Sequence, residues 1–550
     1  MFSRTDGLNR RTRWTANPID SRLWRGALAL ALILALGLSL PHTRLQAAGN
    51  NYYVDSVHGS DGNSGTSPDQ AWKSLGPVNA RQFQPGDVIN FACGSTFYGG
   101  LVIDDSGTEG NPITFQAYGS GDKPVFSNSG AWSRSITINA SWVVVKDLLL
   151  RDAAEFGVRI SENANHNVVQ GCEATGVGIG VGIYGQYNLV THSYFHDLKM
   201  VNNTPGGDDD YGAYAIGIYN SNNEISYNAM KRCRAPSYDY GQDGGVIEFF
   251  NTVSGAYIHH NWAEDNNGFL EAGGGAVKDS RVAYNVSLNN GTFAWVHLSG
   301  TFAADVENLR VENNTIVETA PATNGNTYEV FGFSATPNAN TFILRNNIFY
   351  VNDYAYLSSK SGYSHDHNIF YFMQSRTQLG TSLGTGDKLA DPQFVNPAGD
   401  FNLRAGSPAI DAGVDLGYSK DFDNKSVPAG RAPDIGAFEY AAPAAPTPTP
   451  LPPTPVPTPT RVPPTPTPKA TATQAPVGSE PTTTSVAPTP KPTARPTSTP
   501  ASRKYKKHQL SLILRGSRWN AIVWVPWYWT PSWQAGQVGI TLGTAWAYAR

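Results

Sequence analysis

The 550-residue sequence has little cysteine, little charge and only one long apolar run. Its three cysteines, Cys93, Cys172 and Cys233, are too few for a disulfide framework, so packing and hydrogen bonding must stabilise the fold. Charged residues make up 15%, and the formal net charge of −4 provides no basic field that would attract nucleic acid. No P-loop motif is present. The low net charge therefore argues against a nucleic-acid partner, and the missing motif argues against a P-loop NTPase.

The one long apolar run, Gly26 to Leu40, follows an arginine-rich start. This run is short for a membrane-spanning helix and typical of a secretory signal, and Leu45-Gln46-Ala47 suits signal cleavage. We therefore expect residues 1–47 to be a signal peptide and the protein to be secreted or held at the cell surface after bacterial-type export. An uncleaved membrane anchor is the alternative. No membrane span is expected once the signal has been removed.

The C-terminal part has a different composition. Residues 441–500 are rich in Pro and Thr, with repeated Pro-Thr-Pro, which predicts an extended, disordered linker. Residues 501–550 begin with Lys504, Lys506 and Lys507 and continue with an aromatic-rich run from Trp519 to Trp533. This tail suits a surface-attachment signal or a truncated carbohydrate-binding module, and it is too short to predict a core of its own.

A short motif recurs between about Ile113 and Phe370: apolar residues, then polar residues, then an asparagine or a small residue. Each copy ends at one of the positions Cys172, Ser193, Asn228, Asn261, Asn285, Asn314, Asn347 and Asn368. The shorter spacings are those of one β-solenoid coil, and the longer ones add a loop. Stacked coils bury their apolar residues against one another, and stacked asparagine amides can bond to the backbone of the next coil. The sequence therefore predicts an all-β, single-stranded parallel β-helix with asparagines along one corner.

Two further stretches resemble known β-helix proteins. Asp87-Val88-Ile89 and the stretch from Gly107 to Phe115 resemble the opening coils of right-handed parallel β-helix proteins, which include pectate lyases and the chondroitinase B/alginate lyase family. The resemblance implies right-handed coils, with residues 48–112 as N-terminal cap and first coils and residues 113–371 as the helix. It also implies an extracellular polysaccharide as the partner.

The block from Asp391 to Glu439 resembles the C-terminal cap of bacterial surface-associated β-helix proteins. We therefore expect residues 372–440 to form a cap that protects the last coil, whose strand edges would otherwise be unpaired.

Two predicted strands share the pattern Gly-x-apolar-Glu one coil apart and end at Glu248 and Glu271. Side chains alternate along a strand, so both glutamates are expected to point outward on strands about 4.8 Å apart. Carboxyls this close repel each other, so that either one keeps its proton or a cation sits between them. A pair of splayed, solvated glutamates is the alternative. Asp243 and Lys231 complete the candidate catalytic set.

Loops 196–211 and 231–242 are expected to build a cleft wall beside this pair, because function tends to lie on such loops. The candidate substrate-binding residues are Tyr240, Trp262, Glu264, Asp265, Trp295 and His297. The run Asp208, Asp209 and Asp210 is a candidate calcium site, and no other cofactor is predicted.

Three functions remain open on this pattern. In a polysaccharide lyase, a cation on the carboxylates would neutralise a uronate, and Lys231 or Arg234 would abstract the proton. In a glycosidase, Glu248 and Glu271 would be nucleophile and acid, because retaining enzymes need carboxyls about 5–5.5 Å apart. A non-catalytic carbohydrate-binding or adhesion protein of the cell surface is the third. A monomer is expected in each case.

Overall fold

The computed structural model describes residues 49–320, 328–352, 355–373 and 379–442, together with the backbone of three strands between 505 and 549. The expected signal peptide and nearly all of the expected linker lie outside the described residues. No helix in the described part is long and apolar enough to span a membrane.

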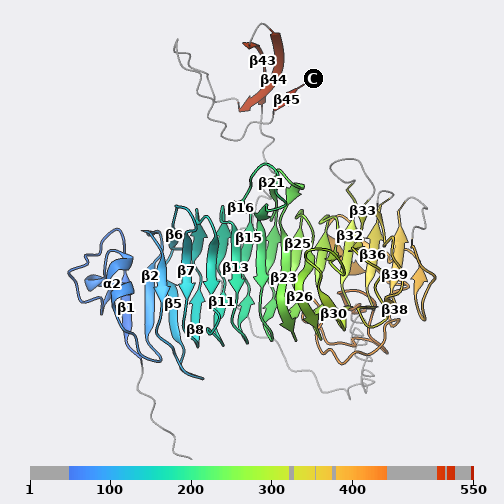
Figure 1. Cartoon of the computed structure of the whole chain (residues 1–550), viewed down its shortest axis with the longest axis horizontal. Helices are drawn as coiled ribbons and strands as arrows, with labels where there is room; N and C mark the ends of the chain where they lie inside the picture. The colour runs from blue at the N-terminus through green and yellow to red at the C-terminus, as the bar shows by residue number, and fades with distance from the viewer. Residues whose placement is uncertain are drawn as a thin grey trace, which may run out of the picture. The chain divides into compact units, whose positions relative to one another are not determined.

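Three long parallel sheets, named A, B and C here, run along the whole solenoid (Figure 1). Sheet A contains β1 (Asn51–Val54), β2 (Val88–Ala92), β5 (Ile113–Tyr118), β8 (Val143–Lys146), β11 (Val168–Gln170), β14 (Leu189–Thr191), β19 (Glu224–Ser226), β24 (Tyr257–His259), β27 (Arg281–Ala283), β31 (Leu309–Glu312), β35 (Phe342–Arg345) and β38 (Ser364–Asp366). Sheet B contains β3 (Thr96–Tyr98), β6 (Val125–Ser127), β9 (Leu149–Arg151), β12 (Glu173–Thr175), β15 (Tyr194–His196), β20 (Ala229–Lys231), β25 (Trp262–Glu264), β28 (Val286–Leu288), β32 (Thr315–Glu318), β36 (Ile348–Val351), β39 (Ile369–Phe372) and β40 (Lys388–Leu389). Sheet C contains β4 (Leu101–Ile103), β7 (Arg134–Ile138), β10 (Phe156–Ile160), β13 (Ile179–Ile183), β18 (Tyr214–Ile218), β23 (Gly245–Ser254), β26 (Leu270–Lys278), β29 (Ala294–Val296) and β34 (Phe331–Phe333), and β30 (Asp305–Glu307) also pairs with β26.

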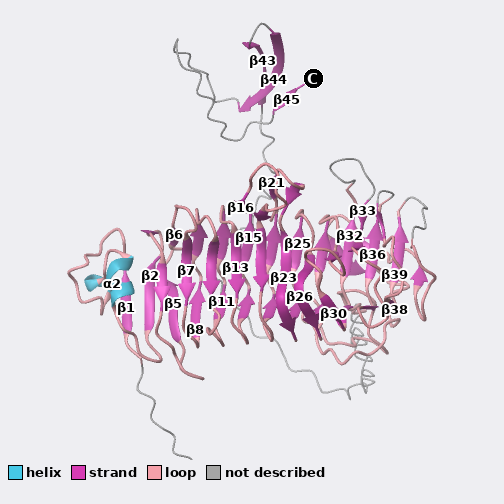
Figure 2. Cartoon of the chain, in the orientation of Figure 1, coloured by secondary structure: helices cyan, strands magenta, loops and turns pink. Residues whose placement is uncertain are grey.

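Most coils contribute one strand to each sheet, and these strands pair in parallel with their counterparts in the next coil. The inward side chains form one continuous buried core from Tyr52 to Leu379. The fold is therefore a right-handed parallel β-helix, as the sequence predicts. Figure 2 shows that strands and loops make up almost all of it; the short helix α2 (Leu75–Ala80) and the 3-10 turn η1 (Pro68–Gln70) belong to the N-terminal end.

The predicted asparagine corner is present between sheets A and B. The backbone N–H of Asn261 donates to Oδ1 of Asn285 at 3.0 Å, and the N–H of Asn285 donates to Oδ1 of Asn314 at 2.9 Å. The amide nitrogen of Asn285 in turn donates to the carbonyl of Ile258 at 3.0 Å. The same links continue from Cys172 through Ser193, Asn228, Asn347 and Asn368. All members are buried, so the ladder satisfies backbone groups that water cannot reach.

Two hairpins project from the turns between sheets B and C. One joins β16 (Met200–Asn202) to β17 (Tyr211–Gly212), and the other joins β21 (Ala235–Ser237) to β22 (Gly241–Asp243). They lie beside each other (Figure 1), because the Asn203 side chain donates to the carbonyl of Pro236 and accepts from the N–H of Tyr238. They come from the two loops predicted to build a cleft wall.

The C-terminal cap differs from the prediction. β40 extends sheet B beyond the last coil, but the following segment, which includes β41 (Phe394–Asn396) and β42 (Asp400–Leu403), folds back along the flank of the solenoid. Asn346 bonds to the carbonyl of Val414 at 2.8 Å, and His260, several coils earlier, bonds to the carbonyl of Asp421 at 2.9 Å. The apolar residues of this segment form a second buried cluster with residues of sheet B. The segment thus covers one side of several coils, and its apolar residues shield outward-facing apolar residues of sheet B from solvent.

The remaining strands form small pairings. β33 (Tyr328–Glu329) pairs with β37 (Ala355–Tyr356), and in the separate C-terminal unit β43 (Tyr505–Leu514), β44 (Ser517–Pro526) and β45 (Ala547–Ala549) form an antiparallel sheet.

Candidate active site

Glu248 and Glu271 occupy facing positions on β23 and β26 of sheet C. Their neighbours Ile247 and Leu270 are buried in the core, so alternation along each strand turns both glutamates to the outer face. Facing positions on parallel strands lie about 4.8 Å apart. The predicted side-by-side arrangement of the two glutamates is therefore present.

The same outward position can be followed from coil to coil through the strand register. It is held by Gly182, Gly217, Glu248, Glu271, Trp295 and Gly332 in successive coils. The glycines on both sides of the acidic pair leave room for aromatic rings from neighbouring positions, which lie over them. A pocket opens over the pair, lined by residues that include Asn267, Thr292 and Trp295.

Glu248 is the more enclosed of the two acids, with 8% of its surface exposed. Burial, followed by the charges of Glu271 and Asp243, raises the pKa of Glu248 well above its usual range. Within the described part of the chain, no protein group donates a hydrogen bond to this carboxyl and no cation pairs with it. This environment favours the protonated form of Glu248, whose carboxyl lines the pocket.

Glu271 has a different environment. Its Oε1 lies 2.8 Å from Nε2 of His297, and about a third of its side chain is exposed. His297 in turn contacts the rings of Trp295 and Phe302 edge-on. The histidine therefore orients the Glu271 carboxyl, which places His297, predicted to bind substrate, in the site.

Asp243 is the third acid of the site. It ends β22 at the base of the second hairpin, and its Oδ1 accepts the N–H of Gly244 at 2.7 Å. Burial raises the pKa of Asp243 to about 6, and the charges of Glu271 and Asp210 add to this effect. The charge of Glu271 thus raises the pKa of both Glu248 and Asp243.

Two tyrosines that the sequence reasoning missed flank Glu248 on the other side. The hydroxyls of Tyr214 and Tyr219 lie 2.6 Å apart, and both rings occupy the space above Gly217 that a side chain would fill. Tyr219 also stacks on Tyr184 at a ring distance of 4.3 Å. The strand register could have predicted these tyrosines. Gly217 occupies the position of Glu248 one coil earlier, so residues near Gly217 lie beside Glu248.

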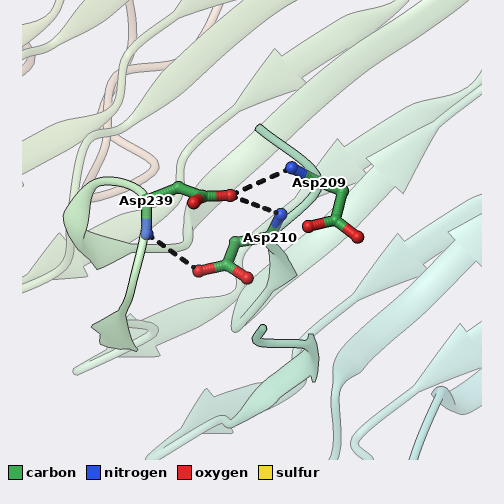
Figure 3. A group of neighbouring side chains, drawn as sticks. All are labelled: Asp209, Asp210 and Asp239. Carbon is green, nitrogen blue, oxygen red and sulfur yellow. Dashed lines mark hydrogen bonds between the residues drawn. The ribbon is translucent and has the colours of Figure 1, made fainter. Parts of the chain in front are cut away.

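The acidic run of the first hairpin behaves differently from a calcium site. Asp209, Asp210 and Asp239 bring their carboxylates together between the two hairpins (Figure 3). Asp239 accepts the backbone N–H groups of Asp209 and Asp210, and Asp210 accepts those of Tyr238 and Asp239.

The other oxygens of these acids are also engaged. Asp210 accepts further hydrogen bonds from Ser237 Oγ and from the N–H of Thr204, and Asp209 accepts from Asn202 and Thr204. Asp208, the third predicted ligand, accepts the hydroxyl of Tyr240 at 2.6 Å. Both carboxylate oxygens of Asp209 and of Asp210 thus already accept hydrogen bonds, which calcium would have to replace. The residues therefore fit a clamp between hairpins better than a calcium site.

Lys231, Glu264 and Asp265 are not brought to the acidic pair. Lys231 ends β20 and Glu264 ends β25, both in sheet B, where Nζ of Lys231 lies 2.6 Å from Oε1 of Glu264. Asp265 pairs with Arg234 at 2.7 Å in the following turn. A lysine committed to an ion pair on another sheet does not fit the predicted role of a base acting beside Glu248.

Trp262 and Tyr240 also lie away from the pair. The Trp262 ring stacks on Phe401 at 5.8 Å and contacts Phe422, so the C-terminal segment covers it and it packs rather than facing solvent. This packing could not be predicted from the sequence, because the covering segment is distant in the chain. Tyr240 is half exposed at the tip of the second hairpin, where its bond to Asp208 raises its pKa.

Comparison with known proteins gives short sequence matches. No family model matches the sequence. The chain is 36% identical over 177 residues to lacto-N-biosidase of Bifidobacterium longum subsp. longum, covering 27% of this chain and 11% of that protein. It is 32% identical over 101 residues to alpha-1,3-galactosidase A of Akkermansia muciniphila, covering 18% of this chain and 17% of that protein. The chain thus spans less than a fifth of the length of either curated relative.

Among solved structures, pectate lyase Pel9A matches with a TM-score of 0.51 and 18% identity, over 72% of this chain and 97% of that one. The chain has the parallel β-helix fold of this lyase. A GH136 lacto-N-biosidase from Eubacterium ramulus matches with a TM-score of 0.43 and 17% identity, over 64% of this chain and 72% of that one. At these identities the likeness concerns the fold of the β-helix.

Proposed function

We propose that this β-helix is a secreted glycoside hydrolase that acts on extracellular glycan with retention of configuration. The observation that carries the proposal is the facing pair of Glu248 and Glu271. Glu248 is enclosed with no hydrogen-bond donor among the described residues, and Glu271 is oriented by His297. Retaining enzymes use two carboxyls about 5–5.5 Å apart, which suits facing rungs of parallel strands.

The two environments assign the roles. Glu248 keeps its proton and acts as the acid that protonates the leaving oxygen. Glu271, held by Nε2 of His297, attacks the anomeric carbon and forms a covalent glycosyl-enzyme. Glu248, now ionised, then removes a proton from water, which hydrolyses the intermediate.

Two observations support hydrolysis over the lyase reaction. A lyase must neutralise a uronate and needs a base, yet in the described residues no Lys or Arg pairs with Glu248, Glu271 or Asp243, and Lys231 and Arg234 are paired elsewhere. The names of both curated relatives are those of glycosidases, which adds support from short alignments.

The test is a substrate screen with purified protein that reads two signals. Neutral glycans and uronate polymers are incubated with the wild type, Glu248→Gln, Glu271→Gln and, as a control, Glu307→Gln, an exposed acid that pairs with Lys278. We expect new reducing ends from a neutral glycan without absorbance of unsaturated products. Both site variants should lose at least about 10³-fold in kcat/KM, while Glu307→Gln keeps the wild-type rate.

Unsaturated products from a uronate polymer would show a lyase instead. Binding without cleavage would favour the adhesion alternative.

A further inference from the structure

Trp295 lies one coil beyond Glu271 at the same outward position of sheet C. Its indole leans over the next coil, where the facing residue is Gly332. A Cβ at Gly332 would lie 1.9 Å from Cε3 of the indole, so the ring occupies the space above that glycine. A flat aromatic surface is thus laid on the strand directly beside the acidic pair.

The ring is held and yet open to solvent. His297, which bonds to Glu271, contacts the indole edge-on at a ring distance of 6.1 Å. The six-membered ring of the indole lies over Gly332, and 40% of Trp295 remains exposed. Other aromatic side chains, including Trp132, are also exposed, but Trp295 lines the pocket over the acidic pair. Trp is typical of binding surfaces.

Polar groups and charge near the ring narrow the class of ligand. Asn267 and Thr292 line the same pocket as Trp295, Glu248 and Glu271 and can bond to hydroxyls. The lining contains two carboxyls and no Lys or Arg. A negatively charged sugar would be repelled there, whereas an uncharged ring with an apolar C–H face and a hydroxyl rim matches both the indole and the polar groups.

We infer that Trp295, seated on Gly332, forms a subsite for an uncharged pyranose next to the bond that is cleaved. This inference rests on the proposed function for the position of the cleaved bond, but not for sugar binding itself. Gly332 is a specificity-determining residue of the subsite, because any larger side chain would lift the indole from the strand.

Binding can be measured apart from catalysis by affinity gel electrophoresis in gels that contain a neutral galactan, a xylan, a glucomannan or polygalacturonate. The wild type is compared with Trp295→Ala, Gly332→Ala and Trp132→Ala, the last being a control tryptophan that is 63% exposed. We expect at least one neutral polysaccharide to retard the wild type and Trp132→Ala. Trp295→Ala and Gly332→Ala should weaken that binding about tenfold or more, a loss typical of a central aromatic anchor.

Thermal denaturation of each variant checks that it is folded, and Trp295→Phe, which keeps an aromatic face, should restore part of the binding. Equal retardation of wild type and Trp295→Ala, retardation by polygalacturonate alone, or no retardation by any neutral polymer would overturn the subsite. Cleavage that is insensitive to Glu248→Gln and Glu271→Gln, with binding still dependent on Trp295, would instead overturn the proposed catalytic pair and leave the subsite standing.

Discussion

Glu248 and Glu271 face each other on adjacent strands of sheet C, but they differ in what surrounds them. Glu248 is enclosed and has no hydrogen-bond donor in the described part of the chain, whereas Glu271 lies 2.8 Å from Nε2 of His297. Two like residues on one repeat thus have unlike environments: that of Glu248 favours the protonated acid, and His297 orients the carboxyl of Glu271. This asymmetry is what glycosidic cleavage requires.

The first prediction concerns the pH profile. The charge of Asp243 helps to raise the pKa of Glu248, and Asp243, with a pKa of about 6, is ionised above neutrality. Removing that charge in Asp243→Asn should lower the pKa of Glu248, so that the acid loses its proton at a lower pH. The basic limb of the kcat/KM profile should therefore move to lower pH. Asp305→Asn is the control and should leave the basic limb in place. A basic limb that also stays in place in Asp243→Asn would show that Asp243 does not act on Glu248.

The second prediction concerns the asparagine corner. Asn285 is fully buried, accepts from the N–H of Asn261 and donates to the carbonyl of Ile258. Asn285→Leu leaves these buried groups unpaired and should lower the free energy of unfolding by roughly 1–3 kcal/mol. Urea denaturation measures the loss. The exposed Asn163→Leu should change it by less than about 0.5 kcal/mol, and equal effects of both substitutions would refute the ladder.

Whether a feature of the fold or of the site could be predicted from the sequence depends on how far apart in the chain the contacting residues lie. The corner at Asn285 and the pair Glu248 and Glu271 follow from spacing alone, because one coil of fixed length places equivalent positions on neighbouring strands. The burial of Trp262 does not, because it depends on Phe401, which returns along the flank from a distant part of the chain. The acids of the hairpins were also misleading, since their backbone partners cannot be inferred from composition.

A third prediction follows from Trp262. Since its ring packs against Phe401 and Phe422, Trp262→Ala should reduce the free energy of unfolding by roughly 2–4 kcal/mol. The folded variant should bind glycan as the wild type does. Trp295→Ala should show the reverse, with weak binding and nearly unchanged stability. Loss of glycan affinity in a folded Trp262→Ala variant would show that Trp262 belongs to the binding surface.

The fourth prediction concerns the hairpin clamp. Asp210 is buried, and both of its carboxylate oxygens accept hydrogen bonds from the hairpins, which calcium would have to replace. The Tm should be the same with millimolar calcium chloride and with EDTA. Asp210→Ala should increase hydrogen exchange in residues 200–212 and 235–243, because the clamp opens locally. A calcium-dependent rise in Tm that Asp210→Ala abolishes would show that the site binds the metal after all.

The account depends most on Glu271 as the nucleophile and Glu248 as the acid. Mass spectrometry of Glu248→Gln after incubation with a panel of aryl glycosides tests both, because a good leaving group allows the first step without an acid and the second step is slowed. The account predicts that a glycosyl group accumulates on the peptide that carries Glu271. A glycosyl group on any other residue, or a Glu248→Gln variant that turns over natural glycan at the wild-type rate without an adduct, would contradict it.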